Sequence, residues 1–251
     1  LETDLRLAII RREFELQFQP QIDSANGNLL GVEALVRWRR PDGALVMPGE
    51  FIGHAEKSGI INKIGEYVLV AACQEARRWL DAGIRPFPVA VNISPSQFRN
   101  RDFVSEVENA LDLAGIGAEW LELEVSESVA LNSSECLLET FHRIQRLGVG
   151  IAVDDFGTGF ASLSYLREIP LRKLKIDRSL VSKITMPGPD KAITEAIVKM
   201  GESLNFISIA EGVETDCQAE AIRRTNCSGM QGFLFSHPLS AGDFRDWLGS
   251  R

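Results

Sequence analysis

Short apolar runs alternate with longer amphipathic stretches along most of the chain. The apolar runs have the length and the β-branched content of strands, and they begin near residues 14, 30, 88, 120, 150, 171, 206 and 230. Between most of them apolar residues recur at the 3.6-residue spacing of a helix that packs one face against a sheet. Eight strands that alternate with helices are typical of a closed barrel.

The first two strands form an exception to this alternation. Residues 14–21 alternate apolar and polar positions, residues 23–28 are rich in turn formers, and residues 30–38 read as the next strand. A hairpin makes its two strands antiparallel, whereas strand-helix-strand units are parallel and right-handed. We therefore predict an α/β fold, a TIM-like (β/α)8 barrel with one antiparallel strand near the N-terminus; an open doubly wound sheet is the alternative.

The helices are expected over residues 49–58, 62–81, 101–114, 133–147, 190–203 and 215–225, with a short one from Ser162. Residues 1–251 carry no linker or low-complexity segment, so one domain is expected. Residues 1–13 have apolar positions at helical spacing, and we interpret them as a junction helix from an upstream domain.

Composition and charge narrow the classes of function. Of the 251 residues 45% are hydrophobic and 25% charged, as in ordinary globular domains. A formal net charge of −8 argues against a general binder of nucleic-acid polymers, which needs a basic surface. No apolar run is long enough for a membrane helix, and the four cysteines are far apart without a CxxC pair. We expect a cytoplasmic domain without membrane contact, although the parent protein could be anchored.

Polar residues recur at the ends of the apolar runs. They are Glu33, Asn92, Glu124, Asp154 with Asp155, Lys175, Glu211 and Gln231. A barrel gathers such positions at one mouth. Carboxylates brought that close together raise one another's pKa unless a cation screens them. Because the oxygen donors are hard and the three histidines are scattered, Mg²⁺ or Mn²⁺ is the expected metal, in a metal-dependent enzyme.

Two glutamates lie within strands. Glu33 shares a face with Leu35 and Arg37, and the alternative to a site role is that this face is solvated. Glu122 and Glu124 also share a face. We expect Glu124 inside the barrel and Glu122 on a solvated surface.

The segment IAVDDFGTGF ends a buried-looking strand in two carboxylates, followed by a glycine-containing loop. At a strand end the chain can turn so that Asp154 and Asp155 address two neighbouring cations. The alternative is that both residues cap the next helix while Gly157 and Gly159 supply turn conformations.

Other strand-end residues have two interpretations each. Lys175 and Asp177 suit a site that orients a phosphate or a nucleophile, or they form a plain surface pair. Glu214 suits the start of a helix through the helix dipole alone. Asn92 and Gln231 are neutral oxygen donors or ordinary turn residues.

Several of these segments together resemble one family. The tripeptide Glu33-Ala34-Leu35 is followed by Arg37, and the blocks VNIS, ELEVSES, DDFGTG, KIDRSL, AEGVE and QGFLFSHP appear in order over nearly the whole chain. In these features the chain resembles the EAL-domain phosphodiesterases, which hydrolyse the bacterial second messenger cyclic di-GMP.

The resemblance implies a two-metal site with Mg²⁺ or Mn²⁺. It assigns Glu33, Asn92, Glu124 and Asp154 to one metal, Asp155 to the second, Glu211 to the metals and the nucleophilic water, and Lys175 to that water. It implies substrate contacts from Leu35, Arg37, Gln19 and Gln231, the last of which would also complete the surroundings of the metals. It makes Glu127, Gly157, Gly159, Asp177 and Glu214 supporting residues, with Glu127 anchoring the loop that contains both glycines.

The activity implied is in-line attack of a water on one phosphodiester bond of cyclic di-GMP, which opens the ring to linear 5′-pGpG. The resemblance further implies a homodimer and an upstream GGDEF or sensory domain. The alternative from a different class is a catalytically silent receptor, because some members of the family only bind cyclic di-GMP. A receptor of that kind is expected to have lost part of the acidic set, which is complete here.

Overall fold

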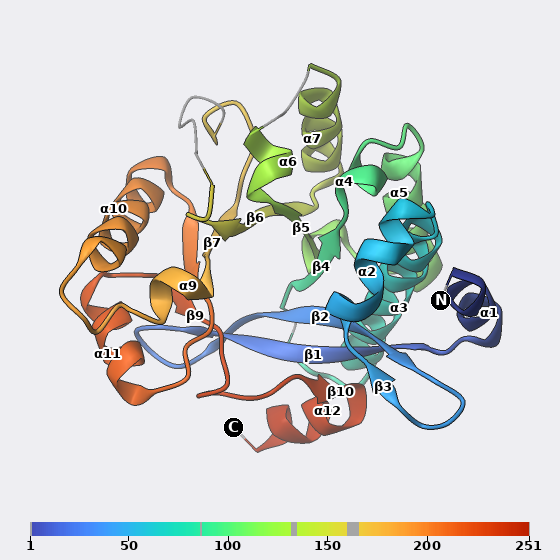
Figure 1. Ribbon diagram of the computed structural model, residues 1–251, viewed down its shortest axis with the longest axis horizontal. Helices are drawn as coiled ribbons and strands as arrows, with labels where there is room; N and C mark the ends of the chain where they lie inside the picture. Colours follow the sequence, from blue (N-terminus) through green and yellow to red (C-terminus); the bar gives the residue numbers. More distant parts are fainter. Residues whose placement is uncertain (1, 86, 132–134, 160–165, 251) are drawn as a thin grey trace.

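The computed structural model describes residues 2–85, 87–131, 135–159 and 166–250. Its centre is a closed ring of eight strands with helices around the outside (Figure 1). The ring strands are β1 (Phe14–Asp23), β2 (Leu29–Arg39), β4 (Val89–Ile93), β5 (Leu121–Ser126), β6 (Gly150–Phe156), β7 (Lys173–Ile176), β8 (Ile207–Ala210) and β9 (Gly229–Met230). The order around the ring is β1-β9-β8-β7-β6-β5-β4-β2, and β1 pairs with β2 to close it. The predicted barrel is confirmed.

Strand β1 is the reversed member of the ring. It pairs antiparallel with both β2 and β9, whereas the pairs from β2 through β4 to β9 are parallel. Within the hairpin Gln19 faces Glu33 and Phe18 faces Ala34. Strand β1 is therefore antiparallel to both of its neighbours in the ring, as the hairpin in the sequence predicted.

The helices cover the ring from outside. They are α1 (Glu2–Arg11), α2 (Pro48–Lys57), α3 (Ile61–Asp81), α4 (Pro95–Phe98), α5 (Phe103–Ala114), α6 (Glu127–Leu131), α7 (Glu135–Leu147), α9 (Arg178–Val181), α10 (Pro189–Leu204), α11 (Asp216–Arg224) and α12 (Ala241–Gly249). The long predicted helices are confirmed to within a few residues. The short helix predicted from Ser162 lies outside the described residues.

Three kinds of element were not predicted. Helices α4, α6 and α9 are each a single short turn or two at a strand exit, and β3 (Leu45–Val46) and β10 (Leu239–Ser240) are two-residue strands. Helix α12 packs against β1 through Phe244, which is fully buried 6.2 Å from the ring of Phe18. Ser240 caps this helix by accepting a hydrogen bond from the backbone of Asp243.

Strand β9 is shorter than expected. The apolar run suggested a strand over residues 230–233, but β9 ends at Met230. At Gly232 the backbone passes directly against Val213, since a Cβ there would meet the Val213 backbone within 2.1–2.7 Å. The strand therefore does not continue past this close approach. Gln231 lies at the rim, where the backbone N–H of Gln231 donates to Ala210 O and its backbone carbonyl accepts from Val213 N.

Candidate active site

The polar residues singled out in the sequence come from consecutive strands of the ring. Glu33 lies on β2, Asn92 on β4, Glu124 on β5, Asp154 and Asp155 on β6 and Lys175 on β7, while Glu211 and Gln231 directly follow β8 and β9. The carboxyl ends of parallel strands meet at one rim of a barrel. The structure thereby brings together residues separated by up to 198 positions, as shown by the hydrogen bond from Gln231 to Glu33.

A single buried ammonium group lies at the centre of the site. Lys175 is fully buried, and its Nζ lies 2.7 Å from Glu211, 2.8 Å from Glu124, 3.1 Å from Glu33 and 3.3 Å from Asp154. A lysine has three protons to donate, so four carboxylates exceed what it can satisfy. The alternative interpretation of Lys175 as a surface pair with Asp177 is wrong.

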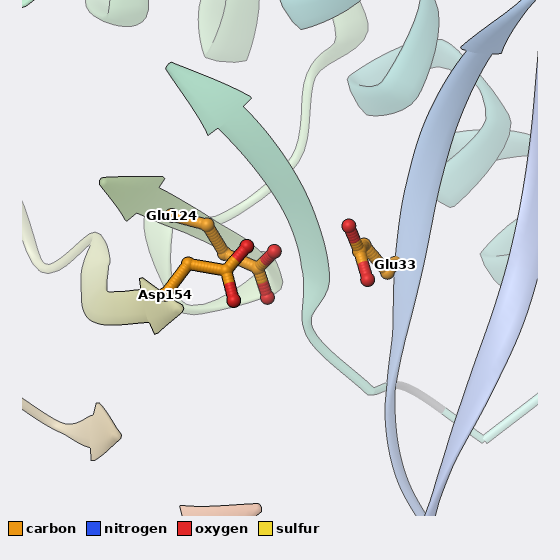
Figure 2. A group of neighbouring side chains, drawn as sticks. All are labelled: Glu33, Glu124 and Asp154. Atoms are coloured by element: carbon orange, nitrogen blue, oxygen red, sulfur yellow. The ribbon is translucent and has the colours of Figure 1, made fainter. Parts of the chain in front are cut away.

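The carboxylates also face one another across the barrel mouth. In Figure 2 the side chains of Glu33, Glu124 and Asp154 point from β2, β5 and β6 toward a common centre. Carboxylate oxygens of these three residues lie within 4.8 Å of one another, and so do those of Asp154, Asp155 and Glu211. Two groups of oxygen donors thus share Asp154, a geometry that suits two neighbouring divalent cations.

Amide groups fix the orientation of Glu33. Its Oε1 accepts a 2.6 Å hydrogen bond from Asn92 Nδ2, and its Oε2 accepts a 2.6 Å bond from Gln231 Nε2. Gln231 also donates to Gln19 Oε1 at 3.1 Å, so Gln19 belongs to the same network. Glu33 is 5% exposed, which overturns the alternative of a solvated strand face.

The surroundings push the pKa values of the glutamates apart. Burial disfavours the charged form of Glu33, but Lys175 and the amides of Gln231 and Asn92 outweigh it and lower its pKa. For Glu124, burial and the neighbouring charges of Glu33 and Asp154 raise the pKa well above its ordinary value despite Lys175. In Lys175 burial opposes ionisation, and the surrounding carboxylates nevertheless raise the pKa well above its ordinary value.

Two further carboxyl groups retain protons at higher pH than usual. Burial raises the pKa of Glu211 to about 8, with Asp154 and Glu33 adding to the effect and Lys175 opposing it. Burial, Asp154 and Asp177 raise the pKa of Asp155 to about 6. For both groups, burial and the neighbouring carboxylates outweigh the opposing effect of the Lys175 ammonium.

One sequence prediction about this region is wrong. Glu122 does not lie on a solvated face; it is 1% exposed inside the barrel, where its Oε1 lies 2.5 Å from Lys173 Nζ. The physical reason is the two-residue repeat of a strand, which puts Glu122 on the same inward face as Glu124. Lys173 shares the inward face of β7 with Lys175 for the same reason, and it was overlooked in the sequence.

The loop after β6 is held by Glu127. Its Oε2 accepts hydrogen bonds from the backbone N–H of Gly157 at 2.9 Å and of Gly159 at 3.3 Å. Gly157 has a φ of +100°, and a Cβ there would lie 2.5 Å from Leu180, so this turn requires glycine. The rest of the loop, including Phe160, Ala161 and Ser162, lies outside the described residues.

Leu35 and Arg37 continue the inward face of β2 beyond Glu33. Leu35 and Asn92 line a cavity of about 270 Å³ with an apolar wall from Pro48, Ile52 and other residues of α2 and α3. Arg37 is 4% exposed, and its guanidinium donates to Gln17 Oε1 at 2.9 Å and to Val36 O at 3.0 Å. Burial lowers the pKa of Arg37, and the negative charges of Glu33 and Glu15 oppose that effect.

A second cavity, of about 250 Å³, opens beside Glu33 and Glu211. Its lining includes Gln19, Gln231, Asp155, Asp177 and Glu214, together with Arg178 and Phe233, which the sequence had not singled out. Asp177 caps α9 by accepting from Ser179 N, and Glu214 precedes the N-cap of α11. Both residues are therefore near the carboxylates without joining either group of oxygen donors.

Comparison with known proteins places the chain in one family. The profile of the family described as "EAL domain" matches residues 2–238. The chain is an EAL domain. Its match to this family covers the whole barrel, including every residue at the rim discussed above.

The EAL domain is similar to two curated proteins of Pseudomonas aeruginosa. It is 44% identical over 238 residues to the bifunctional diguanylate cyclase/cyclic di-GMP phosphodiesterase MucR, which covers 95% of this chain and 35% of that protein. It is 40% identical over 248 residues to the cyclic di-GMP phosphodiesterase NbdA, covering 99% of this chain and 32% of that protein. The chain therefore spans about a third of the length of these relatives.

A solved structure described as "PaMucR Phosphodiesterase, c-di-GMP complex" has the same fold. Its TM-score to this EAL domain is 0.93 at 43% identity, covering 97% of this chain and 98% of that one. Among the described residues of this EAL domain no helix has the length and apolar character needed to cross a membrane.

Proposed function

We propose that this EAL domain hydrolyses cyclic di-GMP to linear 5′-pGpG with the help of two Mg²⁺ or Mn²⁺ ions. The observation that carries the proposal is the pair of carboxylate groups that share Asp154 around the buried Lys175. The similarity to MucR and NbdA supports the choice of substrate, since both are named as cyclic di-GMP phosphodiesterases.

The residues present fit two hard divalent cations. Four carboxylates contact the one ammonium of Lys175 and Asp155 lies beside them, and the pKa values of Glu124, Glu211 and Asp155 are raised, so the site has negative charge to neutralise. Glu33, Asn92, Glu124 and Asp154 would hold one cation, Asp155 would hold the second, and Glu211 would serve the metals and the nucleophilic water. When bound, such a pair of cations supplies an acidified water and screens the charge on a phosphodiester.

The chain itself orients the reacting groups. Lys175 keeps four carboxylates at 2.7–3.3 Å from one ammonium, and in the proposed reaction Lys175 and Glu211 would bind the nucleophilic water. Arg37 would bind a phosphate, because a guanidinium forms paired hydrogen bonds with its oxygens. Leu35, Gln19 and Gln231 would contact the rest of the substrate, and Glu127 would hold the loop through Gly157 and Gly159.

Turnover of cyclic di-GMP tests the proposal. The domain is incubated with Mg²⁺ or Mn²⁺, and the products are separated by chromatography, with EDTA and the Glu33→Ala variant as negative controls. The Glu108→Ala variant is a matched control, because Glu108 is an exposed glutamate on α5, away from the rim. We expect metal-dependent formation of pGpG by the wild type and by Glu108→Ala.

The receptor function gives a different result in the same experiment. A catalytically silent EAL domain would bind cyclic di-GMP in a titration and release no pGpG at any metal concentration. That outcome, with a folded protein, would overturn the proposed hydrolysis. The homodimer, the upstream domain and the junction role of residues 1–13 stay predictions that this assay does not address.

A further inference from the structure

A second polar layer lies inside the barrel beneath the rim. It consists of Gln21, Glu122 and Lys173, which are 0%, 1% and 2% exposed. Glu122 and Lys173 precede Glu124 and Lys175 by two residues on parallel strands. Gln21 instead follows Gln19 by two residues, because β1 runs in the opposite direction. We call these three residues the lower polar layer.

Small residues on the neighbouring strands make room for this layer. Two residues before the rim position, β2 has Gly31, β4 has Ala90 and β6 has Ala152, whereas β8 has Ile209, whose side chain lies against Gly229 of β9. A Cβ at Gly31 would lie 3.3 Å from Gln21 Oε1 and 3.1 Å from Pro88 O, so a side chain there would press on the Gln21 amide. Three long polar side chains thus lie at the level where β2, β4 and β6 have only small residues.

Hydrogen bonds connect the lower polar layer to Glu33 in one direction. Lys173 Nζ donates to Gln21 Oε1 at 2.8 Å, and Gln21 Nε2 donates to Gln231 Oε1 at 3.1 Å. Gln231 Nε2 then donates to Glu33 Oε2 at 2.6 Å. Gln21 Nε2 also lies 3.5 Å from Glu124 Oε1.

The donor character of Lys173 sets the orientation of both amides. An ammonium group only donates, so Gln21 must turn its oxygen toward Lys173 and its NH₂ toward Gln231. Gln231 must then accept through its oxygen and present its NH₂ to Glu33, which only accepts when ionised. Reversal of either amide would place two acceptors or two donors against each other in a buried site, at a cost of about 1–3 kcal/mol for each unmade bond.

From this chain of contacts we infer that Lys173 and Gln21 are positioning residues that hold the Gln231 amide with its NH₂ toward Glu33. Glu122 keeps the Lys173 ammonium in place at 2.5 Å. The metal ligand Glu33 is thereby oriented from beneath by the lower polar layer and from the rim by Asn92. Hydrogen bonds behind a metal ligand fix its direction, and their loss weakens metal binding by about 10–100-fold.

The inference rests on the proposed metal site, and a titration with Mn²⁺ tests it. The variant is Gln21→Met, which retains the length of the side chain and the Lys173–Glu122 pair but removes the amide. The matched control is Ile209→Val, since Ile209 is fully buried on β8 two residues before Glu211 and has no part in the chain of hydrogen bonds. Calorimetry gives the Mn²⁺ affinity, steady-state kinetics gives kcat and KM, and thermal unfolding in EDTA gives stability.

We expect Gln21→Met to bind Mn²⁺ about 10-fold more weakly than Ile209→Val, with a lower kcat and an unchanged KM. Equal Mn²⁺ affinity in the two variants, with wild-type binding intact, would overturn the inference and leave the proposed function standing. Failure of the wild type to bind Mn²⁺ would instead contradict the proposed function.

A measurement on the metal-free protein tests the inference if the wild type does not bind Mn²⁺ or if Gln21→Met folds poorly. In a ¹⁵N-labelled sample the side-chain NH₂ of Gln231 is assigned by its loss in Gln231→Glu. We expect slow hydrogen exchange of this group in the wild type, because both donors are engaged by Glu33 and Gln19. Rapid exchange, or two sets of signals from two amide orientations, would overturn the inference.

Discussion

The rim of the barrel and the lower polar layer each surround a buried lysine with polar side chains, but they differ in charge. At the rim Lys175 is shared by four carboxylates, and Asp155 adds a fifth. In the lower polar layer Lys173 has one carboxylate, Glu122, and one amide, Gln21. The two layers are only two residues apart along β5 and β7.

The difference separates a structural ion pair from a functional site. In the one-to-one pair of Lys173 and Glu122 the two buried charges offset each other, although Glu122 Oε2 has no hydrogen-bond partner among the described residues. An excess of carboxylates at the rim is costly, and the cost appears as the raised pKa values of Glu124, Glu211 and Asp155, of which only Glu124 is fully buried. Such an excess of carboxylates supports the proposed metal site at the rim.

The largest effect is expected on turnover when the rim loses a carboxylate. Glu33→Ala removes a proposed metal ligand together with the acceptor of Asn92, Gln231 and Lys175. We expect kcat/KM for cyclic di-GMP to fall by about 10³-fold or more, equivalent to about 4 kcal/mol of transition-state stabilisation. Chromatographic assay of pGpG measures it, and activity within tenfold of wild type would show that the rim is not the metal site.

Stability should respond in the opposite sense in the two layers. Glu122→Ala leaves the Lys173 ammonium buried without its carboxylate, and we expect a loss of about 3–5 kcal/mol in the free energy of unfolding. Glu211→Gln replaces a carboxyl group whose pKa of about 8 keeps it largely protonated at neutral pH, so the metal-free domain should be as stable as wild type at pH 7 and more stable above pH 8. Denaturant unfolding in EDTA compares the two, and equal destabilisation would erase the distinction between the layers.

The pH dependence follows from the rim carboxylates. The pKa of Glu211 rises from 4.5 to about 8 on folding and that of Asp155 from 3.8 to about 6. At a pH between the unfolded and the folded pKa of each group, the folded metal-free domain binds more protons than the unfolded chain. The free energy of unfolding therefore decreases as pH rises from about 5 to about 8. Metal must displace the same protons, so Mn²⁺ affinity should increase over this range by about 10-fold or more.

Thermal unfolding in EDTA and Mn²⁺ calorimetry at pH 6, 7 and 8.5 check both trends. The lower polar layer offers the control, since Glu122→Leu with Lys173→Met leaves the rim carboxylates in place and should preserve the direction of both trends. A metal-free domain that becomes more stable between pH 5 and pH 8 would contradict the raised pKa values.

The smallest effect is expected when the lower polar layer loses its ion pair as a unit. Replacing Glu122 by Leu and Lys173 by Met together removes both charges at similar volume, and such swaps are often close to neutral. We expect the free energy of unfolding to change by about 1–2 kcal/mol, mainly from the lost partner of Gln21. A loss as large as that of Glu122→Ala would mean that the pair itself stabilises the barrel.

The fold was largely predictable because its signals are local. Alternation marked β1 and β2 as a hairpin, and turn residues between them required antiparallel pairing. The prediction was weaker where contacts between distant segments decide the structure. Helix α12 depends on packing of Phe244 against Phe18, and β9 stops at Met230 because Gly232 meets the backbone of Val213.

The sequence predicted which residues form the candidate site but not which of them contact one another. Carboxylates at successive strand ends identified the rim, since the barrel brings strand ends together. The sequence analysis predicted Glu122 on a solvated surface although it shares the inward face of Glu124. The reason is that the sequence does not show which residue could pair with a second buried carboxylate. Its partner Lys173 lies 51 residues away along the chain.

The sequence by itself determined the succession of strands and helices, the reversal of β1 and the set of polar side chains at the rim. These follow from periodicities of two and 3.6 residues and from the positions of charges along each run. Only the tertiary structure decided that four carboxylates share Lys175 and that Lys173 sets the direction of hydrogen bonds to Glu33. The physical reason is that hydrogen bonds and ion pairs act over about 3 Å, and closure of the barrel sets which distant side chains come within that distance.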